Sequence, residues 1–230
     1  MCDMSKLYII GTPIGNLEDI TLRAIRILGE VDVIFCEDTR VTRKLLSRYE
    51  IKTPLRRLDA NIEKTRAKEV IDRLEEGESI AFVTDAGTPG ISDPGNRLVS
   101  SVRQALGDSF PIEPIPGASA LTAAVSISGI KADQFVFLGF LPHKKGRQTL
   151  LKEIASMKRT VVLYESPHRI LKLLGEIAEF MGNRDIVVMR ELTKKFEEVR
   201  RGTAHRIKEF FEEHRTTVKG EFVVIIPSSE

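Results

Sequence analysis

Short apolar runs alternate with amphipathic stretches along most of the 230-residue chain, and this alternation constrains the fold more than any other feature of the sequence. The apolar runs are short enough for buried strands, and the stretches between them place apolar residues three and four positions apart, as helices do. Strands that alternate with helices are typical of α/β proteins with largely parallel sheets. The sequence therefore predicts an α/β fold.

The predicted elements follow from these runs and spacings. Strands are predicted at Leu7–Ile10, Val31–Cys36, Ser79–Thr84, Ile112–Ile115, Phe135–Gly139, Thr160–Tyr164, Ile186–Arg190 and Phe222–Ile226. Helices are predicted at Thr21–Leu28, Thr42–Tyr49, Glu63–Glu75, Asn96–Leu106, Leu121–Ser128, Gln148–Met157, Ile170–Met181 and Ala204–His214. Ser166-Pro167 is predicted as an N-cap followed by the first residue of a helix. The chain divides near Ile115-Pro116-Gly117, so 1–115 and 116–230 are predicted as two small α/β domains.

The composition is that of a folded chain, with 42% hydrophobic and 30% charged residues. Because the sequence has no signal-peptide pattern and no apolar run long enough to span a membrane, we expect a cytoplasmic protein without membrane contact. Cys2 and Cys36 cannot form a disulfide framework, and they show no metal-binding spacing with the four histidines, so no metal site is expected. The net charge of +2 excludes only a uniformly basic surface.

Four turns rich in glycine, proline or charged residues follow predicted strands, where open α/β sheets bind their ligands. They are Gly11–Asn16, Thr84–Gly95, Pro116–Ala120 and Tyr164–Arg169. The first is not spaced as a phosphate-binding or dinucleotide-binding loop, and taken alone it is better explained as an ordinary strand-to-helix turn. The second is longer than a turn requires, which favours a function. The third begins a helix whose free N–H groups could hold a polar ligand, although close helix packing would also explain its small residues.

Basic side chains gather in two segments. Residues 40–57 contain seven Lys or Arg side chains and one acidic residue, Glu50, and a second cluster is Lys144-Lys145-Gly146-Arg147. Nucleic-acid binding requires side chains that neutralise phosphates, although a run of charge is often only a solvated surface. The residues predicted to bind RNA are Arg40, Arg43, Lys44, Arg48, Lys144, Lys145 and Arg147.

Several motifs in a fixed order resemble the rRNA small-subunit methyltransferase I family. They are Gly11–Asn16 with Leu17 and Asp19, Glu37-Asp38-Thr39-Arg40, Asp85–Gly95, Pro116–Ala120, Phe140-Leu141-Pro142, Glu165–Arg169, Arg190-Glu191-Leu192-Thr193-Lys194 and Gly220-Glu221. This family is the ribosomal-RNA branch of the tetrapyrrole-methylase-like methyltransferases, which use S-adenosylmethionine. The resemblance covers nearly the whole chain, and its one small departure is Thr84, where the family more often has serine.

The resemblance implies a tetrapyrrole-methylase-like fold of two α/β domains, with the ligand in a cleft between them, and a homodimer. It also implies which residues contact the methyl donor, S-adenosylmethionine. These are Pro13, Ala86, Gly87, Thr88, Ile91, Ser119, Ala120, Leu163, Tyr164, Glu165, Leu192 and Glu221. Backbone groups would make much of this contact, which agrees with the glycine and proline content of the turns.

The reaction that the resemblance implies is methylation of the ribose 2′-oxygen of a cytidine in the decoding region of 16S, or small-subunit, rRNA. The substrate would be that rRNA or the assembled small ribosomal subunit. The hydroxyl must lose its proton, and Asp38, Glu165 and His168 are candidate acceptors, with Arg40 orienting or neutralising a neighbouring phosphate. Asp38 and Arg40 could instead form a structural pair, and Glu165 could only bind the donor. No single base is assigned.

Two other functions remain open from the sequence. One is a methyltransferase of the same superfamily that acts on a tetrapyrrole or on a protein side chain. The other is a non-catalytic RNA-binding protein, which the intact loop Asp85–Gly95 disfavours. A nicotinamide-dependent dehydrogenase is also disfavoured, because no G-x-G-x-x-G motif follows a predicted strand.

Overall fold

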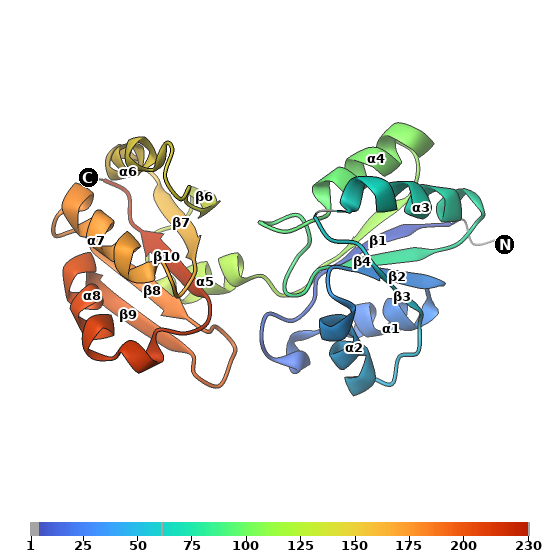
Figure 1. Ribbon diagram of the computed structural model, residues 1–230, viewed down its shortest axis with the longest axis horizontal. Helices are drawn as coiled ribbons and strands as arrows, with labels where there is room; N and C mark the ends of the chain where they lie inside the picture. Colours follow the sequence, from blue (N-terminus) through green and yellow to red (C-terminus); the bar gives the residue numbers. More distant parts are fainter. Residues whose placement is uncertain (1–4, 61, 230) are drawn as a thin grey trace. The chain divides into compact units, whose positions relative to one another are not determined.

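The computed structural model describes residues 5–60 and 62–229, and it shows an α/β fold in two compact units (Figure 1). Unit 1 extends to Ser119, and unit 2 begins at Ala120. The sequence placed this boundary after Ile115. The segment after Ile115 belongs to unit 1 because it contacts the turns that follow the strands of that unit. Within the described ranges, no helix is both long and apolar enough to cross a membrane.

Unit 1 contains a five-stranded parallel sheet in the order β3-β2-β4-β1-β5. Its strands are β1 (Leu7–Ile10), β2 (Val33–Cys36), β3 (Leu55–Arg57), β4 (Ile80–Val83) and β5 (Ile112–Ile115). Its helices are α1 (Leu22–Glu30), α2 (Thr39–Arg48), α3 (Glu63–Glu75) and α4 (Asn96–Leu106), with a short 3-10 helix, η1 (Leu17–Asp19). In the register of the sheet, Leu7 lies opposite Ile80 on one side and Ile112 on the other.

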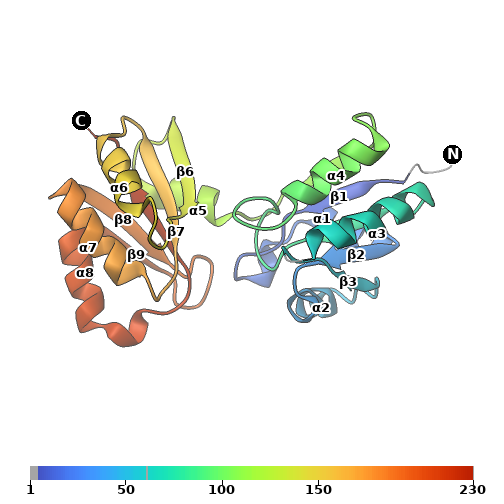
Figure 2. The ribbon, with the colours of Figure 1, turned by 45° about the horizontal axis from the view of Figure 1, so that its top comes forward.

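Helices cover both faces of this sheet, so its central strands are buried on both sides. One core cluster packs α1 and α2 against one face, and the other packs α3 and α4 against the opposite face (Figures 1 and 2). Ile34 and Phe35, neighbours on β2, point into different clusters and are both fully buried. This two-sided burial explains why β2 and β4 are apolar throughout rather than alternating.

Unit 2 contains a five-stranded mixed sheet in the order β6-β7-β10-β8-β9. Its strands are β6 (Phe135–Phe140), β7 (Thr160–Glu165), β8 (Asp185–Arg190), β9 (Glu198–Thr203) and β10 (Phe222–Ile226). Its helices are α5 (Ala120–Ser128), α6 (Arg147–Ser156), α7 (Ile170–Met181) and α8 (Ala204–Glu213), with a 3-10 helix, η2 (Arg215–Thr217). The main core packs α6, α7 and α8 against the sheet around side chains such as Leu163, Leu173 and Phe211.

The prediction of largely parallel strands is correct for unit 1 and wrong for unit 2. Among the described residues of unit 2, only β6 and β7 pair in parallel, whereas β10 runs antiparallel to β7 and β8, and β9 runs antiparallel to β8. Parallel neighbours need a crossover of about a dozen residues or more, usually a helix. The connection from Arg190 to Glu198 holds no helix and is too short for such a crossover, so β8 and β9 form an antiparallel pair.

Two strands were not predicted, and both are edge strands. β3 and β9 carry several charged side chains, because an edge strand has one open side and faces solvent more than a central strand does.

A further difference from the prediction concerns the N-cap expected at Ser166. The backbone carbonyl of Ser166 accepts hydrogen bonds from Arg169 and Ile170, so a turn comes first and α7 begins at Ile170.

Candidate functional site

Three of the four predicted turns meet at the carboxyl ends of strands in unit 1. The backbone groups of Thr12, after β1, and Gly87, after β4, exchange two hydrogen bonds of 2.9 and 3.1 Å. The hydroxyl of Thr88 donates to the carbonyl of Ala118, after β5, over 3.2 Å. Segments far apart in the sequence therefore form one surface of backbone groups at this edge of the sheet, where open parallel sheets bind ligands.

The backbones of the first and third turns touch at Gly11 and Gly117. A Cβ added at Gly117 would lie 2.8 Å from the Cα of Gly11, closer than real Cβ atoms approach backbone. Gly87, in the long loop, has a φ of 83°, in the region that favours glycine. Glycine is thus required at these positions by close backbone approach and by backbone conformation.

Three buried side-chain oxygens of the described residues lack a hydrogen-bond partner: Thr84 Oγ1, Glu165 Oε2 and Thr193 Oγ1. Buried polar atoms are nearly always hydrogen-bonded, so each unpaired one calls for an explanation. All three lie in segments that the sequence analysis singled out. Thr84 begins the long loop; its backbone carbonyl accepts from the Thr12 hydroxyl at 3.2 Å, while its own buried hydroxyl has no partner.

Asp38 and Arg40 form a tight pair at the start of α2. Asp38 Oδ1 accepts from the backbone N–H of Arg40 at 2.8 Å, and the Arg40 guanidinium donates to the same carboxylate, with Nη2 2.6 Å from Oδ2. These hydrogen bonds, and the positive charge of Arg40, lower the pKa of Asp38 to about 2. Asp38 therefore acts here as the N-cap of α2, and a carboxylate with so low a pKa is a weak proton acceptor.

The pKa values of two neighbouring carboxylates, Glu37 and Asp85, are raised rather than lowered. Sequence reasoning did not propose these two residues as proton acceptors. Burial, and then the nearby Asp85, raise the pKa of Glu37. Desolvation, and to a smaller extent the charge of Asp38, raise the pKa of Asp85. Asp85 Oδ1 also accepts from the backbone N–H of Asp38 at 3.0 Å, which joins the long loop to the start of α2. Clustered carboxylates with raised pKa values are typical of acid–base sites.

The fourth turn, in unit 2, follows β7 and contains a buried ionic network. Glu165 is 1% exposed, and its Oε1 accepts from Ser166 N at 2.8 Å. The guanidinium groups of Arg169 and Arg147 lie 3.6 and 3.9 Å from its two carboxylate oxygens. The carboxylate of the predicted residue Glu165 is thus buried between two guanidinium groups rather than exposed to solvent.

Arg147, predicted to bind RNA, is instead a buried structural residue. It is 3% exposed, and its guanidinium binds the Glu176 carboxylate of α7 at 2.6–3.0 Å and the carbonyl of Pro142 at 3.0 Å. An arginine that is fully engaged in a buried pair cannot reach a phosphate. The prediction failed because its neighbours Lys144 and Lys145, which are exposed, made the segment resemble a uniform basic loop.

The remaining predicted residues of unit 2 occupy different environments. His168 is exposed, and Leu163 and Leu192 are buried. Tyr164 packs edge-on against Phe137 and Phe140, with ring centroids 4.8 and 5.9 Å apart. Glu221 lies on the surface, where its carboxylate is 3.0 Å from Lys194 Nζ. Lys194 also binds Glu191, at 2.7 Å.

Left-handed backbone marks the segment that follows β8. Glu191 and Thr193 have φ values of 53° and 67°, which are unusual for residues other than glycine. Such conformations persist where the surrounding structure holds them, and they gather at functional sites. Here the backbone N–H groups of Glu191 and Thr193 bond to Glu221 O and Glu197 Oε2 at 3.0 and 2.6 Å.

The basic residues of α2 form an exposed surface. Arg43, Lys44 and Arg48 face solvent, while Leu45 and Leu46 are buried against the sheet. In the part of the chain that the structure describes, no ion pair within 4.0 Å neutralises these three cations, whereas Arg57 is paired with Asp59. Unpaired cations on one helix face are suited to bind phosphates.

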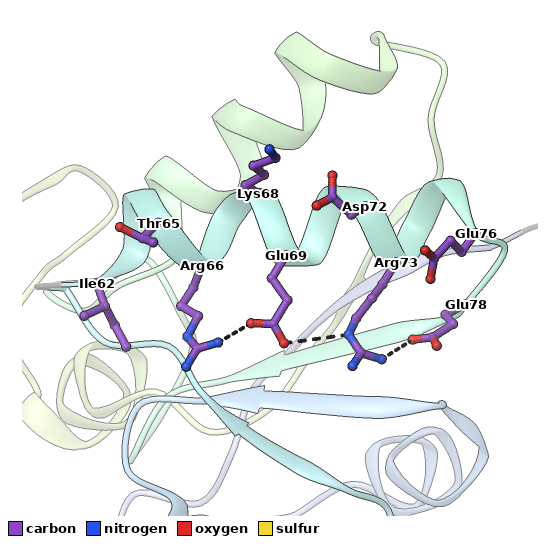
Figure 3. A pocket seen from close by; sticks show the side chains of 9 residues that line it. All are labelled: Ile62, Thr65, Arg66, Lys68, Glu69, Asp72, Arg73, Glu76 and Glu78. Atoms are coloured by element: carbon purple, nitrogen blue, oxygen red, sulfur yellow. Dashed lines mark hydrogen bonds and ion pairs between the residues drawn. The ribbon is translucent and has the colours of Figure 1, made fainter.

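A pocket on the surface of α3 contains none of the predicted site residues (Figure 3). Its charged side chains pair with one another. Arg66 binds Glu69, and Arg73 lies 3.7 Å from Glu69 and 2.8 Å from Glu78. Since these charges neutralise each other, the pocket offers no evident selectivity for a ligand.

Comparison with known proteins agrees with the fold. The family described as Tetrapyrrole (Corrin/Porphyrin) Methylases matches residues 6–208. Among solved structures, a diphthine synthase covers 97% of this chain and 89% of its own length at a TM-score of 0.73 and 15% identity. A cobalt precorrin-4 methyltransferase covers 98% and 96% at a TM-score of 0.70 and 18% identity. The matched family and the shared fold define a methyltransferase of the tetrapyrrole methylase class.

Relatives of higher identity narrow this class. A protein of Thermotoga maritima named ribosomal RNA small subunit methyltransferase I is 44% identical over 99% of this chain and 100% of its own length. Another of that name, from Halalkalibacterium halodurans, is 46% identical over 97% of this chain and 76% of its own length. The chain belongs to the ribosomal RNA small subunit methyltransferase I family.

We predict that Gly117→Ala destabilises unit 1. The added methyl group would meet the backbone of Gly11, which cannot rotate away, so the free energy of unfolding should fall by about 1–3 kcal/mol. Gly29→Ala is the matched control, because a Cβ at that position in α1 meets nothing within 4 Å. Urea denaturation of the two variants measures the difference. Equal stability of both variants would contradict the close contact.

The Asp38–Arg40 pair predicts a specific pH dependence. Because the pKa of Asp38 is about 2 in the folded chain and 3.8 ordinarily, its contribution to stability is complete above pH 3.8 and is lost as the pH falls towards 2. NMR titration of the carboxyl carbon should give a midpoint near 2, and Arg40→Ala should move it towards 3.8. An unchanged midpoint in Arg40→Ala would show that Arg40 is not the cause.

Proposed function

We propose that the chain transfers a methyl group from S-adenosylmethionine to the 2′-oxygen of a cytidine ribose in the decoding region of small-subunit rRNA. The observation that carries this proposal is the joining of the three turns of unit 1 into one surface of backbone groups. Family membership supports the choice of reaction class. The exposed cations of α2 favour an RNA substrate over a tetrapyrrole.

The three joined turns fit the methyl donor. The unpaired hydroxyl of Thr84 is a polar group at the start of the long loop, and Gly87 has no side chain to block close approach of a ligand to the backbone. The proposed donor contacts in unit 1 are Pro13, Ala86, Gly87, Thr88, Ile91 and Ser119. Those proposed in unit 2 are Ala120, Leu163, Tyr164, Glu165, Leu192 and Glu221. When bound, S-adenosylmethionine supplies an activated methyl group. The chain aligns the ribose oxygen with that group, and such alignment can contribute roughly 7–11 kcal/mol.

The ribose hydroxyl must also give up a proton, and we propose His168 as its acceptor. Asp38 is occupied as a helix cap by Arg40, and Glu165 is buried between two guanidinium groups. His168 is exposed, and imidazole is the side chain best suited to proton transfer near neutral pH. The carboxylates of Glu37 and Asp85, with their raised pKa values, are the second candidate.

The direct test supplies labelled S-adenosylmethionine with undermethylated small ribosomal subunits or free small-subunit rRNA, and then maps the labelled nucleotide. Label on the 2′-oxygen of a cytidine in the decoding region supports the proposal, and the two substrates show whether the assembled subunit is required. Methyl transfer to a tetrapyrrole alone would support the other members of the superfamily. Failure of the donor to bind saturably would support a non-catalytic RNA-binding protein.

His168→Gln should lower kcat by about 10²–10⁴-fold while the Kd for the donor stays unchanged, because the variant removes a proton acceptor and no donor contact. Single-turnover methyl transfer and calorimetry measure the two quantities. The paired variant is Asp85→Asn. Turnover that survives in His168→Gln and is lost in Asp85→Asn would assign proton transfer to the carboxylates of unit 1 instead.

A triple variant should bind RNA more weakly and with a smaller dependence on salt if glutamate replaces Arg43, Lys44 and Arg48. Each phosphate that is no longer neutralised changes the slope of log K against log [salt] by about 0.7–0.9. The matched control reverses Arg206, Arg215 and Lys219, three exposed cations of unit 2 outside the predicted surfaces. Fluorescence titration over a salt series measures both. The same weakening in both triple variants would show a nonspecific effect of net charge.

We also infer a cytoplasmic homodimer. The exposed aromatic side chains Phe135 and Phe140 lie at the two ends of the edge strand β6, and two large apolar side chains exposed on one edge strand support an interface between copies. Light scattering should give about twice the chain mass of 25.8 kDa. A mass of a single chain would overturn the inference.

A further inference from the structure

Helix α4 begins directly after the long loop and has no cap of its own. Its N-cap residue is Gly95, which has no side chain to accept a hydrogen bond and has a φ of 131°. The first backbone N–H groups of any helix lack partners inside the helix and need acceptors from elsewhere. At this helix the acceptor must come from another part of the chain.

Glu63, the first residue of α3, supplies that acceptor. Its Oε1 accepts from Gly95 N at 3.1 Å and from Leu98 N at 3.0 Å, and the residue is 4% exposed. Helices α3 and α4 lie side by side (Figures 1 and 2), and the two hydrogen bonds of Glu63 join the start of α3 to the start of α4. A buried negative charge at the N-terminus of a helix also interacts favourably with the helix dipole.

This arrangement is a capping box made by one side chain from a different helix. In an ordinary capping box, the N-cap side chain accepts from the N–H three residues later, and the side chain at that later position accepts from the N-cap N–H. Here Gly95 is the N-cap and Leu98 lies three residues later, and neither side chain can accept a hydrogen bond. A single carboxylate oxygen of Glu63 satisfies both N–H groups.

Hydrogen bonds within the loop connect the start of α4 to the residues that we propose contact the methyl donor. Asn96, the first residue of α4, donates from its side-chain amide to the carbonyl of Gly90 at 3.1 Å. Gly90 N also donates to Pro94 O at 3.0 Å, which closes the end of the loop into a small ring. Ile91 lies in this ring, next to Gly90. A shift in the start of α4 would therefore move Gly90 and Ile91.

The beginning of the loop is anchored separately. Thr12 pairs with Gly87, and Thr88 donates to Ala118. With Glu63 at the other end, the loop is fixed on both sides of the segment Gly87–Ile91. Removing the Glu63 carboxylate would release one end only, so unit 1 should keep its sheet while this segment loses its defined position.

We propose that Glu63 is a positioning residue for the methyl-donor site: by capping α4 from α3, its carboxylate holds the loop Thr84–Gly95 in the geometry that binds the donor. This inference rests on the proposed function of that loop. Glu63 acts through the loop, because its accepting oxygen is occupied by two backbone N–H groups.

The test compares Glu63→Ala with Glu63→Gln. The alanine variant loses both hydrogen bonds, whereas the amide oxygen of glutamine can still accept them. Losing a helix cap changes an equilibrium constant by roughly threefold to thirtyfold. The Kd for S-adenosylmethionine should therefore rise by about that factor in Glu63→Ala and by less than about threefold in Glu63→Gln. The KM for the donor should rise in parallel, while kcat at saturating donor should stay within about twofold.

Glu69→Ala is the matched control. Glu69 lies on the same helix, but its carboxylate faces the surface pocket and pairs with Arg66 and Arg73 rather than with the loop (Figure 3). Its removal should leave the Kd for the donor unchanged. RNA affinity should also be unchanged in both alanine variants, which separates a displaced loop from general unfolding.

The outcomes are distinct. A folded Glu63→Ala variant with wild-type donor affinity, or equal losses in Glu63→Ala and Glu69→Ala, would overturn the inference. If Glu63→Ala does not fold, Glu63→Asp decides, because its shorter side chain keeps the charge but cannot reach both N–H groups at once. Weaker donor binding by folded Glu63→Asp would support the inference, and unchanged binding would overturn it. Absence of donor binding in the wild-type chain would instead contradict the proposed function itself.

Discussion

The contact between the backbones of Gly11 and Gly117 determines how the candidate site of unit 1 is built. It brings the turn after β1 against the turn after β5, which are neighbouring strands of a parallel sheet. The long loop after β4 then joins this pair through Thr12 and Thr88. A side chain at either glycine would separate the first and third turns, so the proposed donor surface depends on two residues that contribute no side chain.

The sequence predicted the central elements of both units and the turns of unit 1, because both signals are local. Buried strands such as β2 and β4 are apolar throughout, and glycine and proline mark their turns. The edge strands β3 and β9 carry no such signal, since pairing with a neighbour rather than burial defines them. The direction of β10 was also inaccessible, because it depends on which strands it pairs with.

The candidate site shows the same division between local and long-range information. The chain order Lys144-Lys145-Gly146-Arg147 cannot reveal that Arg147 points inward, because its partner Glu176 lies in another helix. In the same way, the raised pKa of Glu37 depends on burial and on Asp85, which follows a different strand. Glu63 is an ordinary surface-type residue in the sequence, and only the packing of α3 beside α4 gives it the role of a cap.

The position of β10 has a consequence for how the chain folds as it is synthesised. All five strands of unit 1 lie before residue 119, so that unit can fold early. In unit 2 the last of the described strands, β10 (Phe222–Ile226), is the central strand of the sheet, and it joins the pair β6-β7 to the pair β8-β9. The second core therefore cannot close until β10 has left the ribosome, and a chain that stops shortly before Phe222 would leave two separate strand pairs with exposed apolar faces.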